Sequence, residues 1–109
     1  TTAEQYEEGY RNILTQVKEN TNAKIIILEP FVLPVPEDRK QWREDLDPKI
    51  AVVRSLAREF GALYIPLDGI FASYSTRKNP EYWAADGVHP TKAGHAVIAK
   101  EWLKTVGAM

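Results

Sequence analysis

Apolar residues recur at helical spacing near the start of the chain and then give way to a continuous apolar run. Residues 3–19 carry apolar side chains three or four positions apart, which predicts an amphipathic helix. These side chains are Tyr6, Tyr10, Ile13, Leu14 and Val17. Residues 24–28 form a run rich in β-branched side chains, which predicts a strand buried on both faces of a parallel sheet. The chain therefore begins with a helix and an interior strand.

Prolines interrupt the pattern after this strand. Pro30, Pro34 and Pro36 exclude regular structure across residues 29–37, and a short helix is predicted to carry Trp42. Asp47 followed by Pro48 predicts the cap and first turn of the next helix, because Pro is favoured where the backbone N–H has no partner. The apolar face of that helix is formed by Ile50, Val53, Ala57 and Phe60, and Gly61 ends it.

The last third of the chain repeats the alternation of strand and helix. Residues 62–67 predict a second strand, and Asp68 predicts the cap of a short helix that runs to about Arg77. Thr91 predicts the cap of a final helix, in which Gly94 permits close backbone approach. The apolar stripe of the final helix is predicted to hold Ile98, Trp102 and Val106.

The order helix, strand, helix, strand, helix is typical of an α/β fold with a doubly wound parallel sheet. Two strands are too few, however, because a sheet usually has about four to six. Another segment of the same protein is the simplest source of the other strands, and a swapped homodimer is the alternative source. Since the 109 residues also start without a Met, we expect residues 1–109 to be part of a longer chain, within a single domain.

Composition narrows the classes of function. Hydrophobic residues make up 44% and charged residues 27%, which is ordinary for a globular protein. The 14 Lys and Arg against 15 Asp and Glu give a net charge of −1, so we expect neither nucleic acid nor a membrane surface as a partner. The chain has no Cys, which excludes disulfides, thiolate metal sites and a Cys nucleophile. Localisation stays open, with the cytoplasm slightly favoured over secretion.

The segment Asp86-Gly87-Val88-His89-Pro90 carries the chemistry. An acid three residues before a histidine can set a carboxylate against an imidazole within one loop. In a Ser-His-Asp triad, that carboxylate fixes the imidazole tautomer and stabilises the imidazolium formed when the histidine takes the serine proton. We therefore predict Asp86 and His89 as the acid and the base of a triad. The loop is expected at the carboxyl ends of the strands, where ligands bind in such sheets.

The block from Asp86 to Thr91, followed by Ala93-Gly94-His95 and an apolar helix, resembles the last block of the SGNH, or GDSL, hydrolases. Finer similarities point to bacterial members that act as acetylxylan and other carbohydrate acetylesterases. They lie in Glu29-Pro30-Phe31, Leu67-Asp68-Gly69 and Tyr82-Trp83.

This resemblance implies a flavodoxin-like three-layer α/β/α fold with a parallel sheet, of which this chain holds the C-terminal half. It also implies hydrolysis of a small-molecule ester, with acetylated carbohydrate as the expected substrate and no cofactor. The nucleophilic serine and the oxyanion hole would come from the N-terminal segment of the same protein. The chain alone is then expected to be inactive.

Other sources of chemistry are weaker. Ser73 and Ser75 lack the sharp Gly-x-Ser-x-Gly turn that exposes a nucleophile, and Ser55 lies within a predicted helix. A metal site formed by Asp86, His89 and His95 is disfavoured, because the two histidines lack the spacing of known zinc motifs. No metal is therefore expected. A non-catalytic α/β module that binds carbohydrate or a protein partner stays open as the alternative function.

Three aromatic side chains are candidates for an acyl or sugar pocket: Phe31, Trp42 and Trp83. Of these, we predict Trp83 and Phe31 as substrate-binding residues, although large aromatics more often pack a core. Glu29 is expected to be a structural hydrogen-bonding group. The charged run at residues 37–40 is expected to be a solvated helix face.

Overall fold

The computed structural model describes residues 1–107 of the chain. The N-terminal half contains α1 (Ala3–Asn20), β1 (Ile26–Leu28), a 3₁₀ helix η1 (Glu37–Trp42) and α2 (Arg43–Phe60). The C-terminal half contains β2 (Leu63–Ile65), α3 (Leu67–Tyr74), α4 (Pro80–Trp83) and α5 (Lys92–Gly107). The predicted alternation of helix and strand is confirmed.

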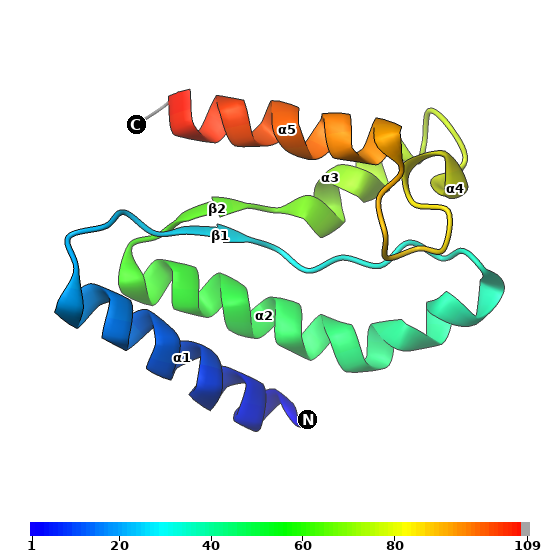
Figure 1. The fold of residues 1–109 in the computed structure, drawn as a ribbon. Coiled ribbons are helices and arrows are strands. Elements are labelled where there is room, and N and C mark those ends of the chain that lie inside the picture. Colours follow the sequence, from blue (N-terminus) through cyan, green and yellow to red (C-terminus); the bar gives the residue numbers. More distant parts are fainter. Residues whose placement is uncertain (108–109) are drawn as a thin grey trace.

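The two strands form the middle layer of the molecule. β1 and β2 pair in parallel, with Ile27 opposite Tyr64. Figure 1 shows α1 and α2 on one side of this pair and α5 on the other, so the arrangement is helix, sheet, helix. The fold class is therefore α/β with three layers, as predicted.

Each face of the sheet has its own apolar core. Leu14 of α1 and Val53 and Leu56 of α2 pack with Ile27 on one face. On the other face, the buried side chains come from both strand ends and the C-terminal helices. They are Leu33, Ile65, Leu67, Phe71, Trp83, Ala84 and Val97. The burial of apolar area on both faces explains why such short strands are held in place.

The predicted start of α2 at Asp47 and Pro48 is wrong. The helix begins at Arg43, directly after η1, and Pro48 lies inside it. Asp47 forms an ion pair with Arg43 at 2.6 Å instead of capping the helix. A second pair, between Lys49 and Asp45, spans the same turns. These pairs link successive turns around the proline, which itself removes one backbone hydrogen bond.

The predicted cap at Asp68 is also wrong. α3 starts one residue earlier, at Leu67, and ends at Tyr74. Asp68 instead turns its carboxylate toward Arg43. Pro80 begins the single turn of α4. In α5 the buried apolar residue is Val97, whereas Trp102 of the predicted stripe is 40% exposed.

Candidate active site

The segment between α4 and α5 is a tight loop fastened at both ends. Ala84 and Pro90 form an isolated antiparallel bridge, and the Thr91 N–H donates to the Trp83 carbonyl at 2.8 Å. Thr91 then caps α5 as predicted, because its Oγ1 accepts the Gly94 N–H at 3.1 Å. The close approach predicted at Gly94 is present, since a Cβ there would collide with the Trp83 carbonyl. The loop is therefore fixed to both helices.

Gly87 gives the loop its sharp turn. Its φ of +87° lies in the region that disfavours side chains, and a Cβ would collide with the carbonyl oxygens of Leu33 and Val35. The same close approach lets the Leu33 N–H donate to the Gly87 carbonyl at 2.8 Å. The segment after β1 and the Asp86–His89 loop are thus joined through backbone atoms.

Asp86 and His89 form the pair that the sequence predicts. His89 Nδ1 lies 2.6 Å from Asp86 Oδ2. Asp86 Oδ1 accepts the backbone N–H groups of Val88 at 3.0 Å and of His89 at 2.7 Å. Because Nδ1 faces the carboxylate, Nε2 of the ring is left for another partner. The His89 side chain is 84% exposed, so that nitrogen is open to the surroundings.

These hydrogen bonds set the charge of the pair. The backbone N–H of His89, followed by the His89 ring and the Val88 N–H, holds the pKa of the Asp86 carboxyl well below its usual range. Asp86 therefore stays an anion through the whole neutral range. A fixed anion at Nδ1 favours the tautomer that carries its proton on Nδ1 and accepts protons at Nε2.

Arg39 supports the loop from the other side, and the sequence reading missed it. Its Nε donates to the Asp86 carbonyl at 2.9 Å, and its guanidinium lies 4.1 Å from the centre of the Trp42 ring. The prediction that residues 37–40 form a solvated face is wrong for Arg39, whose side chain is only 20% exposed. The role of Arg39 could not be predicted, because no sequence feature distinguishes it from the other charged residues in the run at 37–40.

Glu29 anchors the segment that leads from β1 to this loop. Its side chain is fully buried and accepts hydrogen bonds from Arg54 Nε at 2.7 Å, Tyr64 Oη at 2.6 Å and the Asp68 N–H at 3.0 Å. Burial, with the hydrogen bond to Glu29 as the second cause, raises the pKa of Tyr64 above its usual range. The carboxylate is thus occupied by structural donors, as expected for Glu29.

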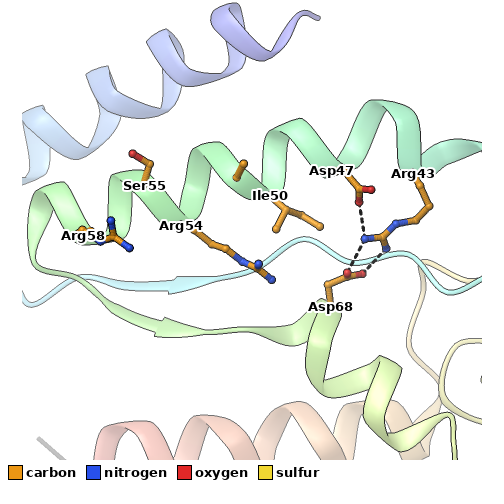
Figure 2. Close-up of a pocket in the computed structure, with 8 residues that line it drawn as sticks. Arg43, Asp47, Ile50, Arg54, Ser55, Arg58 and Asp68 are labelled. Atoms are coloured by element: carbon orange, nitrogen blue, oxygen red, sulfur yellow. Dashed lines mark hydrogen bonds and ion pairs between the residues drawn. The ribbon is translucent and has the colours of Figure 1, made fainter.

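A second polar link lies next to Glu29. Arg43 of α2 pairs with both carboxylate oxygens of Asp68, at 2.7 and 2.8 Å, and also with Asp47 (Figure 2). Asp68 Oδ1 accepts the Val32 N–H as well, at 3.3 Å. The open cavity of about 550 Å³ drawn in Figure 2 lies along α2 and ends at this pair. The link therefore ties the segment after β1 to α2 and α3.

The two predicted aromatic residues, Phe31 and Trp83, lie in different environments. Phe31 lines a cavity together with Val88, the residue before His89. Trp83 is 9% exposed and packs edge-on against Tyr74 in the core, with no partner for its Nε1 among residues 1–107. The role of either residue in substrate binding stays a prediction. Trp42 lines the same cavity as Phe31 and was not among the two predicted residues.

Other candidate groups lie apart from the pair. No cluster of three metal-ligating side chains occurs within residues 1–107. His95 is exposed on the first turn of α5. Ser55 lines the cavity along α2, and Ser75 Oγ donates to the Ala72 carbonyl. In the described part of the chain, the His89 ring has one hydrogen-bond partner, Asp86.

The comparisons with known proteins agree with this geometry. Residues 1–97 match the GDSL-like lipase/acylhydrolase family. The chain belongs to this family. This membership confirms the resemblance to the SGNH, or GDSL, hydrolases that the sequence predicted.

Individual relatives of this GDSL-family chain are similar over nearly its whole length. It is 28% identical over 104 residues to an acetylxylan esterase of Geobacillus stearothermophilus. The solved structure of that esterase gives a TM-score of 0.79 at 26% identity, covering 96% of this chain and 47% of the esterase. An α/β hydrolase from a Lake Arreo metagenome gives 0.84 at 29% identity, covering 98% and 48%. A candidate GDSL-like lipase of Parabacteroides merdae gives 0.90 at 29% identity, covering 100% and 51%.

The chain spans about half the length of the relatives that it matches. Solved variants of the Geobacillus esterase include two described as catalytic mutants, one with a histidine and one with a serine replaced by alanine. No helix within residues 1–107 combines the length and apolar character needed to cross a membrane.

Proposed function

We propose that this chain supplies the acid and the base of a Ser-His-Asp triad that hydrolyses carboxylic esters. The observation that carries the proposal is the 2.6 Å contact between Asp86 Oδ2 and His89 Nδ1, which leaves His89 Nε2 open. Membership of the GDSL-like lipase/acylhydrolase family supports ester hydrolysis as the reaction.

The mechanism follows from the two ring nitrogens of His89. Nε2 takes the proton from a serine hydroxyl as the serine oxygen attacks the ester carbonyl, and then returns it to the leaving alkoxide. A water molecule next gives its proton to Nε2, attacks the acyl-enzyme and releases the acid. Asp86 stabilises the imidazolium at each step through Nδ1.

The nucleophilic serine is proposed to come from an N-terminal segment of the same protein, together with the oxyanion-hole donors. Two observations support this. The relatives are about twice as long as the chain, and no serine hydroxyl within residues 1–107 is hydrogen-bonded to His89. The chain alone is therefore proposed to be inactive.

The proposed substrate is a short acyl ester of a carbohydrate, with acetyl as the acyl group. The similarity to the acetylxylan esterase supports this substrate class. Phe31 is proposed to contact the substrate, because it lines a cavity that reaches Val88 beside His89. Trp83 is proposed as a second contact because it lies three residues before Asp86, whereas its indole Nε1, without a partner among residues 1–107, is buried in the core.

The test uses the full-length protein that contains this chain. His89→Ala should lower kcat for 4-nitrophenyl acetate by roughly 10⁴-fold or more, because the general base is lost. His95→Ala is the matched control and should keep wild-type turnover, since His95 is an exposed side chain on α5. Circular dichroism checks that both variants fold. Near-normal turnover in folded His89→Ala protein would refute the triad.

A further inference from the structure

A cavity of about 560 Å³ lies beside the Asp86–His89 loop. Its walls come from the segment after β1, from the end of η1 with the start of α2, and from the loop itself. The lining side chains include Phe31, Gln41, Trp42, Asp45, Leu46 and Val88. The next residue after Val88 is His89, so the cavity adjoins the loop that carries the proposed general base.

Trp42 dominates this cavity by its size and exposure. A large apolar side chain that is 44% exposed costs solvation free energy unless something covers it. Arg39 lies on the indole ring at 4.1 Å from its centre, yet Arg39 does not itself line the cavity. An aromatic ring has two faces; Arg39 lies over one face of the indole, and the side chain as a whole is exposed and lines the cavity.

Polar groups flank this aromatic surface. The Gln41 side chain makes no hydrogen bond to any residue in 1–107, and it offers one acceptor and two donated protons. Asp45 adds a carboxylate, which is shared with Lys49 at 2.9 Å. An aromatic surface beside a few polar groups is the usual composition of a small-molecule site.

This combination matches a pyranose ring. The C–H face of a sugar is apolar and can stack on an indole, whereas its edge carries hydroxyl groups that need donors and acceptors. We propose that the cavity lined by Phe31, Gln41, Trp42 and Asp45 binds a sugar unit of the substrate, with Trp42 as the stacking surface. This inference rests on the proposed ester hydrolysis and adds the place where the alcohol part of the ester binds.

Arg39 connects this subsite to the catalytic pair. The same side chain stacks on Trp42 and donates to the Asp86 carbonyl at 2.9 Å. Its rigid, planar guanidinium sets the position of the indole relative to the loop that carries His89. A sugar stacked on Trp42 would therefore lie beside the loop that carries the base.

The test compares two esters in the full-length protein, 4-nitrophenyl acetate and acetylated xylobiose. Trp42→Ala should raise KM for acetylated xylobiose ~10-fold, which corresponds to the loss of about 1.4 kcal/mol of binding. The effect on 4-nitrophenyl acetate should be much smaller, because that ester carries no sugar. Trp42→Phe should restore most of the sugar affinity. Trp102→Ala removes a similarly exposed indole from α5 and should match the wild type on both esters.

A binding measurement separates this inference from the proposed function. Xylobiose without acetyl groups is titrated into His89→Ala protein, with and without Trp42→Ala, and binding is followed by isothermal titration calorimetry. Binding that depends on Trp42 supports the subsite whether or not the wild type is an esterase. Equal losses on both esters, or xylobiose binding unaffected by Trp42→Ala, would overturn the inference. Wild-type protein that hydrolyses neither ester would refute the proposed function instead.

Discussion

At the scale of single residues, Asp86 is held by hydrogen bonds to both its side chain and its backbone. Its carboxylate accepts two backbone N–H groups and faces a ring nitrogen, while its own carbonyl is held by Arg39. Such a carboxylate is already oriented before any proton moves, so little reorganisation is needed when His89 becomes charged. Orientation, rather than burial, is the property that the loop provides.

Asp86→Asn tests this role through the pH dependence of stability. Because folding lowers the pKa of Asp86, its stabilising contribution is present above the ordinary carboxyl pKa and is lost as pH falls through the lowered value. The difference in unfolding midpoint between the wild type and Asp86→Asn should be larger at ~pH 7 than at ~pH 3. Urea titration of the full-length proteins measures it. A difference that does not shrink in acid would contradict the assignment of these hydrogen bonds.

The chemistry of this loop was predictable from sequence because all of it is local. Asp86, Gly87 and His89 lie within four consecutive residues, and one turn brings Asp86 and His89 together. Arg39 was not predictable, since it reaches Asp86 across 47 positions and its neighbours are equally charged. Long-range contacts of that kind depend on the packing of η1, which the local sequence does not determine.

At the scale of elements, the junction between α4 and α5 places the loop. Thr91 caps α5 and also donates its hydroxyl to the Tyr82 carbonyl at 2.6 Å, so one side chain joins both helices. Gly94 allows the first turn of α5 to touch the end of α4. The helix start at Thr91 was predictable from its capping side chain, whereas the start of α2 was not.

The α2 prediction failed for a physical reason. Asp-Pro is a common helix start, but η1 continues without a break into α2, so Pro48 falls in the second turn. The Arg43–Asp47 and Lys49–Asp45 pairs stabilise the turns that the proline weakens. Sequence alone does not show whether an Asp before Pro will cap a helix or pair with an Arg four residues earlier.

Gly94→Ala tests the contact between α4 and α5. The added Cβ would meet backbone atoms of Trp83, which cannot rotate away, so we expect a loss of about 1–3 kcal/mol in the free energy of unfolding. Gly9→Ala is the matched control within α1, where no atom lies within 4 Å of the new Cβ. It should stabilise the protein by roughly 0.5–1 kcal/mol through helix propensity. If both variants unfolded at the same denaturant concentration, the junction would not be tightly packed.

At the scale of the whole molecule, the two strands carry the polar groups of the site on their carboxyl ends. Glu29 follows β1 and binds donors from α2, β2 and α3, and Asp68 follows β2 and binds Arg43. The layered fold was predictable from the alternation of helix and strand. The sequence predicted a structural role for Glu29. It did not predict the three donors, because they come from separate elements.

The sheet is small compared with the roughly four to six strands that are usual. Within residues 1–107 the sheet has two strands, whereas the chain spans about half the length of its relatives. These residues include the acid Asp86 and the histidine His89, whose Nε2 has no hydrogen-bond partner among residues 1–107. We therefore propose that the nucleophile is a serine outside this chain.

The most direct test is fluorophosphonate labelling of the full-length protein, followed by intact-mass and peptide mass spectrometry. The reagent tags a serine that a neighbouring base activates. We expect one tag in the wild type, on a serine outside these 109 residues, and almost none in Asp86→Asn or His89→Ala protein. A tag on Ser55, Ser73 or Ser75, or tagging that proceeds equally without His89, would contradict the account.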